Sequence, residues 1–516
     1  MNHLLRLLIT FGESDRGQRF VGMAAGVVLI TAVASIGAHP IVDAGPISQT
    51  QAAPEFTPPP ATTEPTATPA TTGLIAPSAT AAADNIGGLR SGPPVDFGLK
   101  TQGVTDKIVK VGISYNAGSC GDAAAIEGVL GAAVTGDIEK SINTFARYVN
   151  DKGGIGGRKY TPIIVDDGGA GCPERNLAAA VKMADEEKVF LAVPGLHVES
   201  DYIISRKVPV WGGRDDPASL RKYGPNGLQL LPPIEPTLEA WAGFGRHYLK
   251  THTTNNPPCL MRIESGASGN WDIPQAILIE KLKAQGIAFR DIIVFKDDVS
   301  TAQQQANTAA IRARDKGCKQ VWYMAGNPLG LVFITFAAST NNWYPTWTWT
   351  GHTALIDTEL AGRLMDPKQW ENAIGLSLRI PPGEHPKQDN CKKIYQSYNP
   401  DDGLEDSAAV ILACMTVLPT ADIMKRGLER TGRLDANALM VGADSIKQNV
   451  YWDAHVPVEY SFPDADGPFR TRGFSHWTVA DWSSSKNVYE FPAYPCYYEE
   501  FTANGGGCQD LRSKYK

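Results

Sequence analysis

The sequence predicts an α/β protein with two doubly wound lobes, each built on a mostly parallel sheet. From residue 107 onward, short β-branched runs alternate with longer amphipathic segments. This alternation is typical of parallel strands joined by right-handed helical crossovers. The alternation of strand-like and helix-like segments starts again after Pro232-Pro233, which predicts a second unit of the same kind.

In the first unit, IVKVGISY at 108–115 predicts a strand, and 136–153 predicts a helix. The helix has Ile138, Ile142, Phe145 and Val149 at helical spacing and a glycine stop after it. Further strands are expected in YTPIIVDDGG, VFLAVPG and the end of IISRKVPVWGG, with a helix in PERNLAAAVKMADEE.

In the second unit, a helix is expected from Thr237 to Tyr248. Strands are then expected at 259–265, 291–296, in KQVWYMAG, in YPTWTWTG and at 373–380. The intervening segments predict helices, and 406–432 predicts a long helix that Pro419 should break or kink. The tail from 446 is rich in aromatic residues and turns and predicts a β-ribbon, with a turn at 464–467.

Composition and charge narrow the class of protein. The chain has 516 residues, 48 Lys and Arg against 55 Asp and Glu, and a net charge of −7. With 43% hydrophobic and 20% charged residues, it is globular in composition. The acidic balance excludes a generally basic nucleic-acid binder.

The N-terminus carries an apolar segment that lies outside the globular part. Residues 21–38 hold no charge and follow Arg16 and Arg19. As a helix they span about 27 Å, close to the hydrocarbon thickness of a bilayer. Two interpretations stay open: residues 20–41 are a transmembrane anchor behind a short cytoplasmic segment (1–19), or they are a signal segment that is cleaved.

Residues 42–104 form a predicted linker. The stretch is rich in Pro, Thr and Ala and almost uncharged. It cannot bury enough apolar surface to offset its ordering entropy, so we expect a disordered, partly polyproline II spacer.

All eight cysteines follow the linker. An even number behind an export segment indicates disulfides, and no C-x-x-C is present. Pairing of sequence neighbours predicts 120–172, 259–318, 391–414 and 496–508, with a buried free thiol as the alternative for Cys414. The residues are Cys120, Cys172, Cys259, Cys318, Cys391, Cys414, Cys496 and Cys508.

Motifs for catalysis and for metals are missing from the sequence. The run Gly153–Gly157 leaves a helix and enters a strand, the reverse of a dinucleotide fingerprint. The chain has no G-x-S-x-G and no H-E-x-x-H. No enzymatic activity, cofactor or metal is therefore predicted.

Residues 148–169, YVNDKGGIGGRKYTPIIVDDGG, resemble the type I solute-binding proteins of ABC transporters, also called periplasmic binding protein type 1. The turn at 153–158 and the pair Asp166-Asp167 carry most of the similarity, and residues 189–220 support it. The branch it resembles most is the leucine/isoleucine/valine-binding one, over roughly residues 105–485.

The resemblance implies two Rossmann-like lobes joined by a three-strand hinge. Lobe one is then expected at 105–233 plus 382–445, and lobe two at 234–381 plus 446–516. A small organic ligand is expected between the lobes, with an ABC permease as partner and no nucleic acid.

The family's site positions imply the candidate contacts in this chain. The loop after the third strand lacks the Ser/Thr cluster of amino-acid binders apart from Ser200, and Glu199 would repel a carboxylate, which disfavours an α-amino acid. The aromatic run Trp343–Trp349 is expected in core and rim. The predicted ligand-binding residues are Tyr115, His197, Glu199, Ser200, Arg214, Asp215, Glu235, Trp271, Asn327 and His352.

The two α/β units, the N-terminal apolar segment and the resemblance together predict extracytoplasmic solute binding for an ABC-type uptake system. Two alternatives remain: a ligand-sensing ectodomain that acts through a partner, and a secreted two-domain α/β enzyme.

Overall fold

The structure is a computed structural model that describes most of the chain from residue 98 to 497. The predicted N-terminal helix and linker lie outside the described residues, apart from the last linker residues. The described residues are 98–115, 136–168, 173–194, 197–212, 227–228, 234–247, 249, 257–264, 272–295, 301–324, 329–350, 356–371, 373–379, 389–446 and 476–497.

Sheet one has five parallel strands in the order β2-β1-β3-β4-β5. Its central pair is in register over the whole length, from Ile108 opposite Lys159 to Tyr115 opposite Asp166. The strands are β1 (Ile108–Tyr115), β2 (Lys159–Asp166), β3 (Leu191–Val193), β4 (Val210–Trp211) and β5 (Gly227–Leu228). The sequence analysis missed β5, since two residues without a periodic pattern leave no signal.

The helices that connect sheet one follow from local signals. In α5 (Ile138–Asp151), Asp137 caps the first turn by accepting from the Lys140 amide, and Ile142 and Phe145 are buried. The next helix, α6 (Pro173–Val181), continues as a π-helical turn, η1 (Lys182–Glu186). The last, α7 (His197–Ser205), begins inside the segment expected to be a loop, so the backbone is helical from His197 onward and the loop prediction is wrong there.

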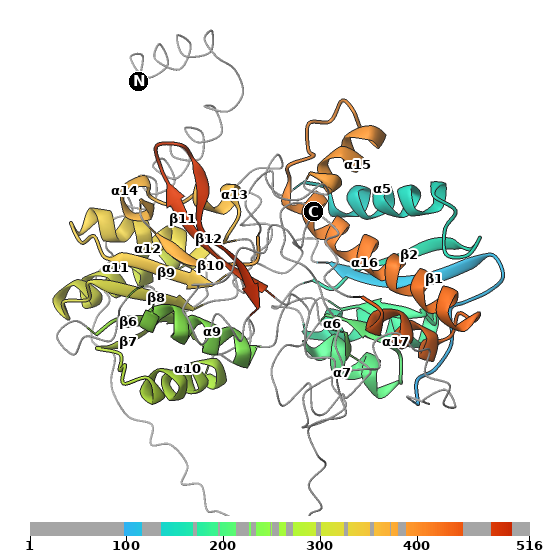
Figure 1. Cartoon of the computed structure of the whole chain (residues 1–516), viewed down its shortest axis with the longest axis horizontal. Helices are drawn as coiled ribbons and strands as arrows, with labels where there is room; N and C mark the ends of the chain where they lie inside the picture. The colour runs from blue at the N-terminus through green and yellow to red at the C-terminus, as the bar shows by residue number, and fades with distance from the viewer. Residues whose placement is uncertain are drawn as a thin grey trace, which may run out of the picture. The chain divides into compact units, whose positions relative to one another are not determined.

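Three late helices pack with the first unit (Figure 1): α15 (Asn390–Tyr398), α16 (Ala408–Thr431) and α17 (Ala436–Asp444). Contacts join α16 to α5 and to α17. The approach of α17 is close because Gly427 and Gly442 face backbone carbonyls; a Cβ on Gly442 would lie 2.0 Å from the Ile423 oxygen.

The long helix α16 runs through Pro419 without interruption, so of the predicted break or kink the break is wrong. It is the one helix among the described residues that is long and apolar enough to cross a membrane, and 61% of its apolar window is buried in the protein. Burial of this kind is typical of a core helix.

Sheet two has seven strands in the order β12-β11-β10-β9-β8-β6-β7. The strands β6 to β10 are parallel, and β11 and β12 add an antiparallel ribbon, as the sequence predicted for the tail. The strands are β6 (Cys259–Ile263), β7 (Ile292–Phe295), β8 (Gln320–Met324), β9 (Thr346–Thr350), β10 (Ile374–Ser377), β11 (His476–Ser483) and β12 (Val488–Tyr497).

Both faces of sheet two are covered by helices. Neighbouring strand residues point to opposite faces, and Leu260 and Met261 of β6 accordingly belong to different apolar clusters. Leu260 packs in the cluster that contains α9 and α10, and Met261 in the one that contains α11 and α12. The helices are α9 (Ile234–His247), α10 (Asp272–Ala284), α11 (Ala302–Asp315), α12 (Leu329–Thr340) and the short α13 (Glu359–Gly362) and α14 (Pro367–Trp370).

Tryptophan dominates the core on the second of these faces. Trp343, Trp347 and Trp349 are buried, whereas Tyr344 is 53% exposed. The prediction of core and rim for this run is confirmed.

Two of the four predicted disulfides are present. Cys259–Cys318 joins the first residue of β6 to the segment just before β8, and Cys391–Cys414 joins α15 to α16. Cys414 is therefore bonded and is not a free thiol. The predicted partners Cys120, Cys172 and Cys508 lie outside the described residues.

Candidate functional site

The strand order itself identifies where each sheet can bind a ligand. In sheet one the chain moves from β1 outward to β2 and then returns to β3 on the other side of β1. The parallel part of sheet two repeats this pattern, with β6 flanked by β7 and β8. Ligands of open α/β sheets bind at the carboxyl ends of the strands at such a reversal.

At the reversal of sheet one, a serine and a glutamate meet. Ser114, the penultimate residue of β1, donates through Oγ to Glu199 Oε2 at 3.0 Å. Glu199 lies in the first turn of α7 and is 0% exposed, and Ser200 beside it is buried. The hydrogen bond fastens the start of α7 across the reversal to the end of β1.

Tyr115 ends β1 and is half-buried at the same edge. Burial raises the pKa of its phenol, and the nearby carboxylates of Glu139, Asp166 and Asp137 raise it further. The hydroxyl therefore stays protonated at neutral pH.

The pair Asp166-Asp167, which carried much of the resemblance, builds the turn after β2. Asp166 accepts from the Gly168 amide at 2.9 Å and pairs with Arg175 of α6. Asn176 donates to the backbone oxygen of Asp167 at 2.6 Å. These contacts hold α6 against the end of β2, which is a structural role.

At the reversal of sheet two, the corresponding polar residue is Arg262, the penultimate residue of β6. It is 7% exposed, and its Nη2 donates to Asp272 Oδ1 at 2.6 Å. Its Nε donates to Gln275 Oε1. Both acceptors lie in the first turn of α10.

Of the residues predicted to contact a ligand, Tyr115, Glu199 and Ser200 lie at the carboxyl edge of sheet one. His197 is the first residue of α7, and Glu235 is the second residue of α9. The other predicted contacts lie outside the described residues: Arg214, Asp215, Trp271, Asn327 and His352.

Sequence reasoning missed Ser114 and Arg262. The available signal for Arg262 was a lone charge in the apolar strand CLMRI, whose residues are all buried. A buried cation needs partners, so such a residue marks a place where polar groups are gathered.

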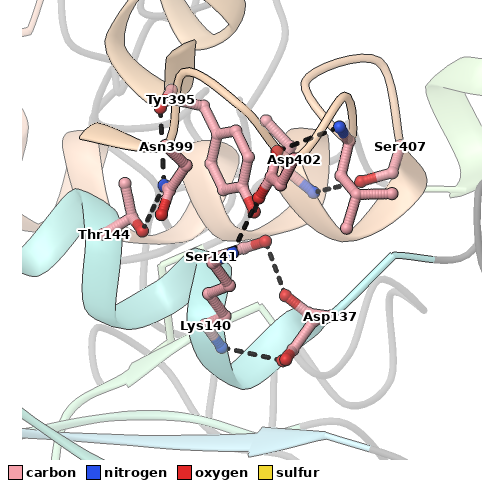
Figure 2. A network of polar contacts seen from close by, with 10 residues as sticks. Asp137, Lys140, Ser141, Thr144, Tyr395, Asn399, Asp402 and Ser407 are labelled. Carbon is pink, nitrogen blue, oxygen red and sulfur yellow. Dashed lines mark hydrogen bonds and ion pairs between the residues drawn. The ribbon is translucent and has the colours of Figure 1, made fainter. Parts of the chain in front are cut away.

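A second polar cluster joins α5 to the segment 395–407 (Figure 2). Lys140 and Tyr395 both donate to Asp402 Oδ2 at 2.8 Å, and Asn399 donates to Thr144 at 3.0 Å. Burial and the bond to Asp402 raise the pKa of Tyr395 to about 12, so it does not ionise at neutral pH. The cluster lacks an available base and fastens α15 to α5.

No group of three or more His, Cys, Asp or Glu side chains in the described part of the chain is arranged to hold a metal ion. The polar groups at both reversals are hydrogen-bonding groups. The carboxyl ends of the strands at these two reversals are the positions at which open α/β sheets bind small molecules.

Comparisons with known proteins agree with this class. A sequence profile of the family described as periplasmic binding protein matches residues 125–474, more than half of the chain. No curated protein matches the chain.

Several solved structures share the fold. A branched-chain amino acid ABC transporter protein from Thermus thermophilus with bound valine superposes with a TM-score of 0.59 at 11% identity, over 78% of this chain and 99% of that one. A fatty acid ABC transporter substrate-binding protein from Thermomonospora curvata gives 0.53 at 13% identity, over 79% and 97%. A leucine binding protein from Thermotoga maritima gives 0.53 at 12% identity, over 76% and 100%.

The chain therefore belongs to the periplasmic binding protein family, and its function is that of an extracytoplasmic solute-binding protein. The two buried disulfides suit an oxidising compartment outside the cytoplasm.

Proposed function

We propose that the chain captures one small organic solute between the carboxyl edges of sheet one and sheet two and presents it to an ABC permease. One observation carries the proposal: both sheets reverse their strand order, and each carries a polar residue one position before the end of the reversing strand. These are Ser114 in β1 and Arg262 in β6. Two of the predicted contacts adjoin these strands in the sequence: Tyr115 ends β1, and Trp271 follows β6.

The polar surroundings of sheet one favour a ligand without a carboxylate on that side. Glu199 is buried at the reversal, and three further carboxylates act on Tyr115. A ligand carboxylate placed there would be repelled. Solved relatives bind valine or are named for fatty acids; for this chain we propose a neutral or cationic polar group on an aliphatic body.

The N-terminal segment 20–41 is proposed to direct export: as an anchor it keeps the protein at the cytoplasmic membrane, and as a cleaved signal it releases the folded part. The linker 42–104 would then let the folded part reach its permease partner. Fractionation of cells that express the full chain, followed by N-terminal sequencing of the membrane and soluble pools, distinguishes anchor from cleaved signal.

The ligand class is tested by thermal unfolding of the full chain with matched compounds: L-leucine, L-leucinamide, isoamylamine and octanoate. A bound compound at 100 times its Kd stabilises by about 2.7 kcal/mol, which raises Tm by a few degrees. We expect leucinamide or isoamylamine to raise Tm more than leucine or octanoate does. Stronger stabilisation by leucine than by its amide would contradict the proposed class.

Site variants complete the test. Trp271→Ala and His197→Ala are expected to remove the ligand-induced shift. Tyr344→Ala is the matched control, because this exposed aromatic side chain precedes β9 at the amino end of sheet two. If Tyr344→Ala removed the shift and Trp271→Ala did not, the proposed edge would be wrong.

A further inference from the structure

Arg262 is a charged residue in a place that otherwise suits an apolar one. All five residues of β6 are buried, and Leu260, two positions earlier on the same face, packs in the apolar cluster with α9 and α10. Burial of a guanidinium costs free energy unless its donors are satisfied.

The donors of Arg262 are satisfied by two short segments. Nη1 donates to the backbone oxygen of Ile263 at 2.9 Å, at the end of its own strand. Nη2 and Nε donate to Asp272 and Gln275 in the first turn of α10. The side chain thus ties the last residue of β6 to the first turn of the helix that follows.

This arrangement contributes little to global stability. Asp272 is 66% exposed, so it remains solvated if its partner is removed. Breaking an ion pair is strongly destabilising when it leaves a buried unpaired charge, and removal of Arg262 leaves no such charge because Asp272 is exposed. The effect of Arg262 is therefore local: it fixes where α10 begins.

We propose that Arg262 is a positioning residue that holds the first turn of α10 against the carboxyl end of β6 and so keeps the solute-binding edge of sheet two in its binding form. The proposal rests on the proposed function, because it concerns the same edge. In the sequence, the predicted contact Trp271 directly precedes Asp272.

A matched control exists at the other end of the same sheet. Arg312 of α11 donates from Nε and Nη2 to the carboxylate of Asp291, both at 2.8 Å, just before β7 begins. This pair lies at the amino end of β7, away from the edge where ligands bind. Asp291 is largely buried, with 15% of its side chain exposed, so loss of Arg312 leaves a poorly solvated carboxylate.

The test compares Arg262→Met with Arg312→Met in the full chain. Three quantities are measured: Tm, hydrogen exchange of the backbone amides of residues 272–280, and affinity for L-leucinamide and L-leucine. For Arg262→Met we expect a Tm within about 2 °C of wild type, amide exchange at least tenfold faster in 272–280 and affinity at least tenfold lower. For Arg312→Met we expect a lower Tm with wild-type exchange in 272–280 and wild-type affinity.

Conservative variants separate positioning from a general folding defect. Arg262→Lys keeps the charge but cannot make the forked contacts to both acceptors, so it should restore exchange only in part. If Arg262→Met does not fold, Asp272→Ala removes the exposed acceptor alone and should still accelerate exchange in 272–280.

Wild-type exchange in 272–280 for both Arg262→Met and Asp272→Ala would overturn the proposal, as would unchanged affinity of Arg262→Met for a compound that wild type binds. If wild type binds neither compound, the proposed ligand class fails, and the exchange comparison still decides the role of Arg262.

Discussion

In both sheet one and sheet two, a side chain on the reversing strand is hydrogen-bonded to the first turn of a helix, but the two side chains differ. Both reverse at their first strand, in the orders β2-β1-β3 and β7-β6-β8. In sheet one a neutral serine on the reversing strand binds a helix that follows the third strand. In sheet two an arginine binds the helix that directly follows its own strand.

The two regions also differ in how they are stabilised. Sheet one ends in two-residue strands, and its neighbouring helices include the small-residue contact between α16 and α17. Sheet two has a tryptophan-rich core, a disulfide near the amino ends of its strands and an added antiparallel ribbon. Topology thus decides where the binding edges lie, while stability comes from residues elsewhere in each region.

The largest expected losses of stability in the two regions come from removal of their disulfides. Cys259–Cys318 in sheet two closes a separation of 59 residues, and Cys391–Cys414 closes one of 23. Loop-closure entropy predicts losses of about 4 and about 3 kcal/mol on removal of each pair by alanine. Urea unfolding of the two double variants measures the losses; a larger loss for the 391–414 pair would contradict the entropic account.

The second comparison concerns one glycine in each sheet. In β10, a Cβ on Gly375 would lie 2.4 Å from the backbone oxygen of Trp349. In β1, a Cβ on Gly112 would lie 2.7 Å from Met183 Sδ, the end of a flexible side chain. We expect Gly375→Ala to cost about 3 kcal/mol and Gly112→Ala about 1 kcal/mol.

Urea unfolding and near-ultraviolet circular dichroism of the two variants check this order. Equal losses would mean that the backbone of β9 shifts as easily as the Met183 side chain does.

The third comparison is a response to pH in the ribbon of sheet two. Burial and the carboxylates of Glu490 and Glu371 raise the pKa of Asp481 to about 6. Its Oδ1 accepts no hydrogen bond from the described residues, and Glu490 lies directly opposite on β12, with Lys486 paired to Glu490. Because the folded-state pKa is raised, stability increases as pH falls through about 6 and is fully gained below about 4.

Asp481→Asn removes this dependence. We expect the variant to be more stable than wild type at pH 7.5 by about 1 kcal/mol, after allowance for solvent screening of a half-buried group. The difference should disappear near pH 4. Thermal unfolding at both pH values measures this difference in stability. A variant less stable than wild type at pH 7.5 would show that repulsion between Asp481 and the neighbouring carboxylates does not destabilise the fold.

The smallest expected effect is a dependence of stability on pH at Asp402, in the first region, with the opposite sign to that at Asp481. Burial would raise the pKa of Asp402, but hydrogen bonds from Lys140, the Leu404 amide and Tyr395 outweigh it and lower the pKa. Its contribution is therefore present above the ordinary aspartate range and lost as pH falls below roughly 4.

Asp402→Asn should cost about 0.5–1 kcal/mol at pH 7 and nothing at the lowest pH at which the protein stays folded. Thermal unfolding of this variant beside Asp481→Asn tests whether the two regions respond to acid with opposite sign. If the Tm differences of the two variants from wild type changed with pH in the same direction, the predicted contrast between the two regions would be wrong.

Much of the fold was predictable because the apolar periodicity is strong. The strand expected at 108–115 is β1, and the helix expected at 136–153 contains α5. Pro419 misled the prediction, because burial against α5 and α17 outweighs one missing hydrogen bond in α16. The strand expected at the end of IISRKVPVWGG is β4, whereas the two-residue β5 exists only through its pairing with β4, which a linear pattern does not contain.

The site was less predictable than the fold. The family pattern pointed to the segment around Glu199, but its hydrogen bond to Ser114 depends on strands that only the folded sheet brings together. The role of Arg262 likewise depends on where α10 begins. Chain position alone does not contain such contacts between separate elements.

The apolar character of α16 has a consequence for secretion. A protein destined for the outside crosses the membrane before it folds, so residues 408–431 pass the export channel without the partners that later bury them. A segment this hydrophobic, with a mean hydropathy of 1.6, is at risk of release into the lipid as a stop-transfer sequence. Pro419 and Asp422 near its middle lower that risk, since a proline weakens the isolated helix and an aspartate is costly in the hydrocarbon. On an export route that carries the unfolded chain, the proline that the folded core tolerates would thus favour passage of this segment.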